Sequence, residues 1–112
     1  MIGHLNLVEE EAVNKLKHIL SQRLGSNLKH IVLYGSKARG DYQDDSDIDL
    51  LVVVESANSA VKDIIRDTVL DIQLEYSLPI SLHIRSFDYV SEQLKNRLNL
   101  FIHNVEREGI RI

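Results

Sequence analysis

Two aspartates separated by one residue are the first side chains of this sequence whose types and spacing could do chemistry. Asp47 and Asp49 alternate with aliphatic residues, so in a strand both carboxylates would point to one face, roughly 7 Å apart. Carboxylate oxygens are hard ligands of the kind that hold Mg²⁺ between a protein and nucleotide phosphates. Taken alone, such a pair at a strand start is more often a solvated edge, so the metal interpretation depends on its surroundings.

A glycine and a serine lie upstream of these aspartates. The apolar run 31–34 predicts a buried strand, and Gly35 and Ser36 then turn the chain towards the basic residues Lys37 and Arg39. The first N–H groups of a helical turn are unpaired, and with the Ser36 hydroxyl they suit phosphate oxygens. Separately, Gly35 is typical of a turn and Ser36 of a helix N-cap. Jointly with the carboxylate pair, they indicate phosphoryl or nucleotidyl transfer.

The strands expected around these residues would bring the two groups together. A first strand is predicted at 29–34, and the segment 50–54 is apolar on both faces, which predicts a strand in the middle of a sheet. Asp44 and Asp45, in the polar loop between them, are expected in a solvated turn.

Helical periodicity and capping residues predict two long helices. The first begins after Asn6, which is followed three residues later by Glu9, and stops at Gly25. The second begins at residue 58 or 59 and ends before Pro79. Beyond it we expect a strand at 80–85, a helix capped by Ser86 with Phe87, Val90 and Leu94 facing inward, a helical stretch over 98–105, and an extended tail at 110–112.

Composition bounds the class of protein. With 112 residues, 44% hydrophobic and 27% charged, the chain is expected to form one globular domain, residues 1–112. The sequence has no cysteine, which excludes disulfides and thiolate metal sites and fits a reducing cytoplasm. It shows no signal peptide and no apolar run of membrane-spanning length, so no membrane association is expected. The formal net charge of −4 argues against a nucleic-acid surface, because phosphate contacts need clustered Lys and Arg.

The longer string around both groups resembles a known family. Gly35-Ser36, ten residues and then Asp47-x-Asp49, within G-S-x-A-R-G-D…S-D-I-D-L, are similar to the minimal nucleotidyltransferases, the smallest branch of the DNA polymerase beta nucleotidyltransferase superfamily. Residues 106–110 also resemble the close of these short proteins. The resemblance implies a mixed α/β fold with a small central mixed sheet flanked by helices.

The same resemblance implies a set of ligands and site residues. It implies Mg²⁺, with two ions possible, and ATP or another nucleoside triphosphate as substrate. Asp47 and Asp49 would be the catalytic residues and metal ligands. The nucleotide-binding residues would be Gly35, Ser36, Lys37 and Arg39.

A partner protein is also implied by the resemblance. Minimal nucleotidyltransferases are commonly encoded beside a small helical HEPN protein and serve as the antitoxin of a toxin–antitoxin pair, and some members adenylylate the toxin. Two interpretations follow for this chain. It transfers a nucleoside monophosphate, AMP from ATP, to a hydroxyl on its partner, or it is a catalytically weak or inactive subunit that neutralises the partner by binding.

One departure from the family pattern bears on that choice. Active members usually carry a third carboxylate on the strand beside the Asp-x-Asp strand. The matching strand here, 80–85, presents Ser81, His83 and Arg85 on its polar face, with no Asp or Glu. A missing third carboxylate removes a metal ligand and a proton acceptor. His83 either substitutes as a base or ligand or is a half-buried structural histidine.

The C-terminal helical stretch is more apolar than one helix face needs. It carries Leu98, Leu100, Phe101, Ile102 and Val105, and Leu100 lies off the face that Leu98, Ile102 and Val105 share. We expect part of this surface to pack against another chain, a second copy or a helical partner. The alternative is that a wrapped C-terminal segment buries these residues within the monomer.

Overall fold

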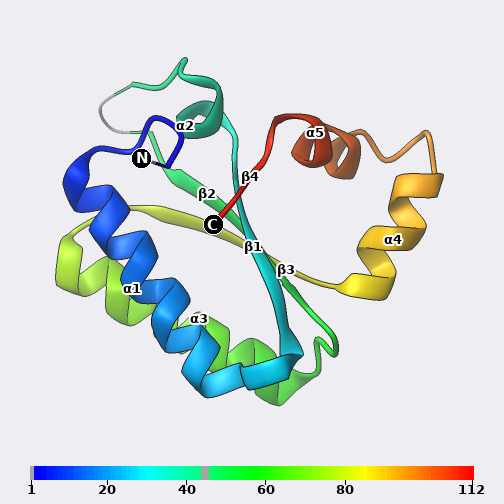
Figure 1. Ribbon diagram of the computed structural model, residues 1–112, viewed down its shortest axis with the longest axis horizontal. Coiled ribbons are helices and arrows are strands. Elements are labelled where there is room, and N and C mark those ends of the chain that lie inside the picture. Colours follow the sequence, from blue (N-terminus) through cyan, green and yellow to red (C-terminus); the bar gives the residue numbers. More distant parts are fainter. Residues whose placement is uncertain (1, 44–45) are drawn as a thin grey trace.

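A four-stranded sheet runs through the centre of the molecule in the order β3-β2-β1-β4 (Figure 1). The structure is a computed structural model that describes residues 2–43 and 46–112, so the turn expected at Asp44 and Asp45 lies outside the described residues. β1 is antiparallel to β2 and β4, whereas β2 and β3 are parallel, which confirms the expected mixed sheet. The strands are β1 (Leu28–Tyr34), β2 (Ile48–Val54), β3 (Ile80–Ser86) and β4 (Ile110–Arg111).

β2 lies in the middle of the sheet, as its apolar sequence predicted. Six of its seven side chains are buried, and Asp49 is the half-buried exception. Residues of the two alternating sets belong to separate hydrophobic clusters, one on each face of the sheet. A carboxylate therefore projects from a strand that is otherwise apolar on both sides.

One face of the sheet is covered by two long helices, α1 (Leu7–Leu24) and α3 (Ser59–Tyr76). Both begin where capping residues predicted: the side chain of Asn6 accepts the N–H of Glu9, and that of Asn58 accepts the N–H of Val61. Gly25, with φ +55°, is the C-cap of α1, and Ser77 is the C-cap of α3, just before Pro79. The main core lies between these helices and the sheet.

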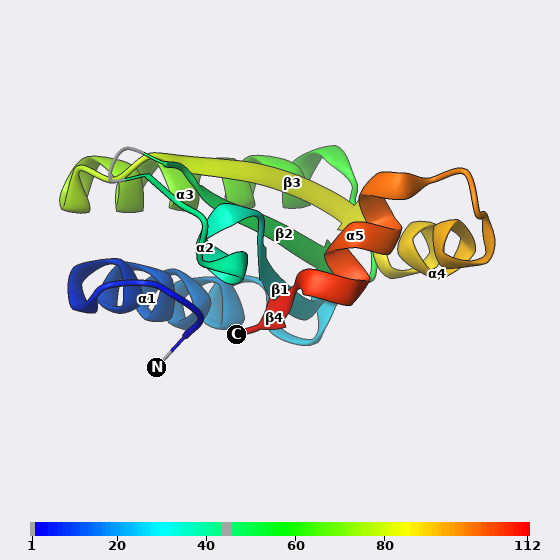
Figure 2. The same cartoon turned by 90° about the horizontal axis from the view of Figure 1, so that it is seen from above.

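The second face carries a smaller layer, α4 (Phe87–Lys95) and α5 (Leu100–Glu108), which lies away from α1 and α3 in both views (Figures 1 and 2). Val90 packs against a small cluster of Val32, Leu51, Val53 and Val105. Phe87 is 45% exposed, so the expectation that it faces inward is wrong. It is the first residue after edge strand β3, and it lies outside the apolar cluster to which Val90 belongs.

The C-terminal tail is extended, as predicted, and it pairs with β1, which the sequence did not predict. Ile110 pairs with Leu33 and Arg111 with Val32, and the N–H of Ile112 donates to the carbonyl of Ile31 at 2.9 Å. The tail thus completes the edge of the sheet beside β1. No helix within the described residues has the length and apolar character needed to cross a membrane.

Candidate active site

The end of β1 and the start of β2 bring Gly35 and Asp49 into contact. Tyr34, the last residue of β1, is the register partner of Asp49. Gly35 follows with φ +74°, a conformation that side chains rarely adopt, and a Cβ built there would overlap Oδ2 of Asp49. The chain therefore needs glycine at this turn for two reasons, and the second is the carboxylate lying against it.

Asp49 is held in an environment that opposes its ionisation. Burial raises the pKa of its carboxyl, and the neighbouring charge of Asp47 raises it further. Positive charge on His83 and Arg39 and the nearby Ser81 hydroxyl lower the pKa without reversing the direction. A bound cation would relieve this effect, because it offsets the negative charge that makes ionisation of Asp49 unfavourable.

The donor set fits Mg²⁺ that is shared with a substrate. Asp47 is exposed just before β2, and Asp49 is half-buried within it. In residues 2–43 and 46–112, no three side chains of His, Cys, Asp or Glu converge on a point that could hold a metal. Mg²⁺ is commonly held by one or two carboxylates, with phosphate oxygens and water completing its octahedron. Two carboxylates at the mouth of a turn suit that role.

Ser36 begins the short helix α2 (Ser36–Arg39) directly after Gly35. The carbonyl of Gly35 accepts the N–H groups of Ala38 and Arg39, each at 3.1 Å, which closes the turn. The Ser36 hydroxyl makes no hydrogen bond with another described residue. Ser36 is half-buried and directly follows Gly35, the residue that lies against Asp49.

Lys37 does not join this group. Its side chain is 3% exposed, and its Nζ lies 2.8 Å from the carboxylate of Glu9 and 4.4 Å from the centre of the Tyr42 ring. The same Glu9 carboxylate accepts the N–H of Asn6 at 2.9 Å. Lys37 thus points to the first turn of α1. The expectation that it binds nucleotide is not supported by this geometry, because its charge is already paired in the interior.

Arg39 lies at the rim of the site. Its guanidinium pairs with Asp41 and with Glu108 of α5, both at 3.2 Å. Its charge also lowers the pKa of Asp49, so it is close enough to act on the carboxylates. Arg39 itself is 43% exposed, and ion pairs at an exposed guanidinium contribute little stability, so phosphate oxygens can compete for it.

Three aromatic side chains, Tyr34, His83 and Phe101, form a cluster on the face of the sheet that carries Asp49. Only one of them was singled out from the sequence. The Tyr34 hydroxyl lies 2.7 Å from Nδ1 of His83, and Phe101 packs on both rings, with centroid distances of 5.5 Å and 5.0 Å. His83 was considered as a site residue, whereas Tyr34 and Phe101 were not. The period of two along the strands would have placed Tyr34 beside Asp49 once the register was known. Nothing in the sequence placed Phe101 there.

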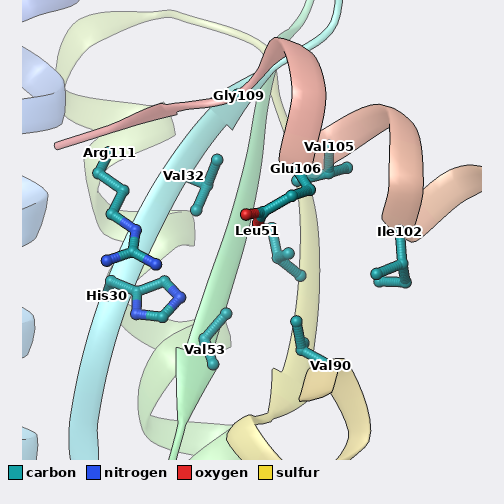
Figure 3. Close-up of a pocket in the computed structure, with 10 residues that line it drawn as sticks. All are labelled: His30, Val32, Leu51, Val53, Val90, Ile102, Val105, Glu106, Gly109 and Arg111. Carbon is teal, nitrogen blue, oxygen red and sulfur yellow. The ribbon is translucent and has the colours of Figure 1, made fainter. Parts of the chain in front are cut away.

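A cavity of about 200 Å³, lined by both apolar and charged side chains, lies on the same face of the sheet (Figure 3). It extends away from Asp49 along β1 and β2, beneath α4 and α5, and contains none of the predicted site residues. Its lining residues are His30, Val32, Leu51, Val53, Val90, Ile102, Val105, Glu106, Gly109 and Arg111. The cavity lacks the carboxylates and the Gly35 turn, so we place the chemistry at the turn and not here.

Comparison with known proteins also relates this chain to nucleotidyltransferases. The model of the nucleotidyltransferase domain family matches residues 13–109. Two proteins of Methanocaldococcus jannaschii whose names propose protein adenylyltransferases are similar to this chain. MJ0604 is 32% identical over 102 residues, 90% of this chain and 94% of the relative. MJ0141 is 29% identical over 102 residues, 91% of this chain and 96% of the relative.

Solved structures share the fold. One proposed to be a minimal nucleotidyltransferase has a TM-score of 0.57 and 23% identity, and the match covers 97% of this chain and 98% of that one. A toxin–antitoxin with AMP-PNP has a TM-score of 0.59 and 17% identity, covering 91% of this chain and 70% of that one. A mutant of the toxin–antitoxin MntA-HpeT has a TM-score of 0.59 and 18% identity, covering 96% and 72%.

Proposed function

The chain belongs to the nucleotidyltransferase domain family, and from that premise we propose that it transfers AMP from ATP to a hydroxyl of a partner protein in a Mg²⁺-dependent reaction. One observation carries the proposal: Gly35 closes directly on the carboxylate of Asp49, whose pKa is raised by burial and by Asp47. That turn offers phosphate-binding groups and metal-binding oxygens at one place.

Each residue of the turn has a role in this proposal. Asp47 and Asp49 hold the metal, and Gly35 and Ser36 hold the triphosphate through backbone N–H groups and the Ser36 hydroxyl. Arg39 offsets phosphate charge from the rim. Lys37 is assigned to fixing α2 on α1 through Glu9. Bound Mg²⁺ would supply electrostatic stabilisation of the charge that develops on the phosphate oxygens.

The reaction moves one group between two oxygens. The acceptor hydroxyl oxygen forms a bond to the α-phosphorus, and the bond from that phosphorus to the bridging oxygen breaks, which releases pyrophosphate. The proton of the acceptor hydroxyl passes to solvent water. The residues of this chain contribute position: the turn at Gly35 fixes the triphosphate relative to β2, so the hydroxyl must approach from the open side.

A protein acceptor is supported by the relatives. Two relatives are named as proposed protein adenylyltransferases, and each matches about nine-tenths of this chain. Structures that share the fold include a toxin–antitoxin with AMP-PNP. We therefore propose that the acceptor is a small helical HEPN-type protein, that this chain is its antitoxin, and that residues 1–112 act as one minimal nucleotidyltransferase domain in the cytoplasm.

A second candidate function has one observation in its favour. The polar face of β3, which lies beside Asp49, carries Ser81, His83 and Arg85 and no carboxylate. A chain with weak or no turnover would then bind nucleotide and neutralise its partner by association alone.

Nucleotide binding is tested by calorimetry with ATP in the presence and absence of Mg²⁺. We expect binding that requires Mg²⁺ and that is lost in the double variant Asp47→Asn/Asp49→Asn. Lys37→Met/Glu9→Gln is the matched control, because it changes two charges outside the carboxylate pair. Equal ATP affinity with and without Mg²⁺, or unchanged affinity in the aspartate variant, would contradict the proposal.

A further inference from the structure

Side chains from three adjacent strands meet on one face of the sheet at Asp49. Tyr34 of β1 and Ser81 of β3 are both register partners of Asp49, and His83 is the partner of Leu51, one step further along the same face. The face opposite holds the α1 and α3 core, to which none of these polar residues belongs. His83 therefore stands beside the carboxylate on the strand where a third acidic residue is absent.

A hydrogen bond bridges this face across β2. The Tyr34 hydroxyl and Nδ1 of His83 are 2.7 Å apart, although their strands lie on either side of β2. Phe101 of α5 meets the Tyr34 ring edge-on at 87° and the His83 ring at 45°. The hydrogen bond to Tyr34 and the packing of Phe101 together fix the plane of the His83 imidazole.

From this placement we infer that His83 is a further substrate-binding residue whose Nε2–H donates to a phosphate oxygen of the bound nucleoside triphosphate, with Tyr34 as its positioning residue. The inference rests on the proposed function and names a group that contacts the substrate of that same site. It also gives the imidazole a purpose other than metal binding, since no three ligand side chains converge within the described ranges.

The hydrogen-bond direction decides which ring nitrogen carries the proton. An ordinary tyrosine phenol has a pKa of about 10, so the Tyr34 hydroxyl carries its proton at neutral pH and can donate across the 2.7 Å to Nδ1. We assign the phenol as the donor to Nδ1, which places the ring proton on Nε2; in the charged form of the ring Nε2 carries a proton as well. Nε2 of His83 is then a hydrogen-bond donor, and a ligand that binds it must offer an acceptor such as an oxygen.

Nε2 is open to a ligand. It has no hydrogen-bond partner among the described residues, and none of their buried side-chain nitrogens or oxygens lacks a partner. Because His83 is only half-buried, its unpartnered Nε2 must reach solvent. The ring also lies near Asp49, since its charge is the leading cause that lowers the pKa of that carboxyl. An N–H donor open to solvent beside a metal-binding carboxylate is complementary to a phosphate oxygen.

Two amide substitutions separate this role from a structural one. The amide of Gln places an N–H near the position of Nε2, whereas that of Asn places it near Nδ1. In calorimetric titrations with ATP and Mg²⁺, we expect His83→Gln to bind within about threefold of wild type. We expect His83→Asn to bind at least about tenfold more weakly, the scale of one hydrogen bond to a charged group.

Tyr34→Phe supplies the second arm. In the wild-type background it frees the imidazole, and we expect a several-fold weaker affinity; in the His83→Gln background we expect no further loss, because Gln does not need the phenol. Thermal unfolding of every variant controls for folding. His83→Asn with wild-type affinity, or His83→Gln as weak as His83→Asn, would overturn the inference. If the wild type does not bind ATP in a Mg²⁺-dependent way, or if Asp49→Asn still does, the proposed function itself is refuted.

Discussion

Asp49 carries its carboxylate into a half-buried position between Gly35 and Ser81, where burial and the charge of Asp47 raise its pKa. A raised folded-state pKa means that the native protein binds the proton more tightly than the unfolded chain. The free energy of unfolding therefore falls as the pH rises through the unfolded-state value of about 3.9 towards the folded-state pKa. Above that range the ionised carboxylate is destabilising, which is common for residues kept for function.

This linkage predicts that Asp49→Asn stabilises the fold while abolishing Mg²⁺-dependent binding. At pH 7 we expect its Tm to exceed that of the wild type by a few degrees, with the difference vanishing near pH 3. Added Mg²⁺ and ATP should raise the Tm of the wild type alone. Scanning calorimetry at several pH values checks both effects. A variant less stable than wild type at pH 7 would show that the carboxylate is already satisfied by protein groups.

Spacing in the sequence predicted part of the geometry at the turn and not the rest. The approach of Gly35 to Asp49 could be predicted, because it depends on strand alternation and on a turn whose positive φ favours glycine. The direction of Lys37 could not, since a basic residue in the first turn of a short helix can face phosphates or the interior. Its choice depends on Glu9, which belongs to a distant helix.

The pair formed by Lys37 and Glu9 is the main polar link between α1 and α2. Both side chains are almost fully buried, and removing one partner would leave the other charge unpaired in the interior. The pair thus holds the turn at Gly35 and Ser36 against the end of α1. A buried pair adds little net stability over two neutral side chains, so we expect the turn to keep its place when both partners are replaced.

We predict that Lys37→Met and Glu9→Gln each lower the free energy of unfolding by about 3 kcal/mol, the usual cost of leaving a buried charge unpaired. The double variant should lose clearly less than the sum, and it should keep Mg²⁺-dependent ATP binding. Urea denaturation of the four proteins gives the coupling energy. Strictly additive losses would contradict a buried pair, and lost ATP binding in the double variant would return Lys37 to the nucleotide site.

The edge strand β4 creates a pH-sensitive position at His30. Burial and then the charge of Arg111 lower the pKa of His30, while Glu106 raises it to a smaller extent. With a lowered folded-state pKa, the unfolded chain takes up the proton first. The free energy of unfolding therefore decreases as the pH falls below the unfolded-state value of 6.5.

His30→Gln should reduce this loss of stability between about pH 7 and pH 5, the range around an ordinary histidine pKa. Arg111→Gln should reduce it in part, because one of the two causes is removed. Chemical denaturation at each pH gives the slope of stability against pH for the three proteins. Identical slopes in wild type and His30→Gln would mean that His30 titrates normally in the folded state.

At the scale of elements, local signals predicted the helices and the interior strands but not the edge. The capping residues Asn6 and Asn58 marked where α1 and α3 begin, and the apolar run in β2 marked the central strand. β4 has two residues and no periodicity, and its pairing depends on where α5 delivers the chain. Such a strand is set by tertiary contacts, which single-sequence patterns do not contain.

The apolar C-terminal residues divide between the core and the surface. Ile102 and Val105 are buried, whereas Leu98 is 89% and Leu100 is 70% exposed. Phe101 packs on Tyr34 and His83, so the exposed leucines lie beside a residue that contacts the polar face near Asp49. The monomer therefore buries part of this stretch and leaves the rest accessible to another chain.

We predict that Leu100→Glu weakens association with the partner protein, or with a second copy, at least tenfold. Leu74→Glu is the matched control, because Leu74 is 71% exposed on α3, away from this layer. Light scattering on the isolated chain measures association between copies, and light scattering on the co-expressed pair measures association with the partner. A strict monomer in both settings, or a complex indifferent to Leu100→Glu, would show that these leucines are ordinary surface residues.

For the whole molecule, the proposed transfer of AMP to a protein is tested most directly by intact-mass spectrometry of the partner protein after co-expression with this chain. We predict that the partner gains the mass of at least one AMP with the wild-type chain, and gains nothing with Asp47→Asn/Asp49→Asn. A partner that binds the wild-type chain but never carries a nucleotide, or carries it equally with the aspartate variant, would contradict catalysis at this site.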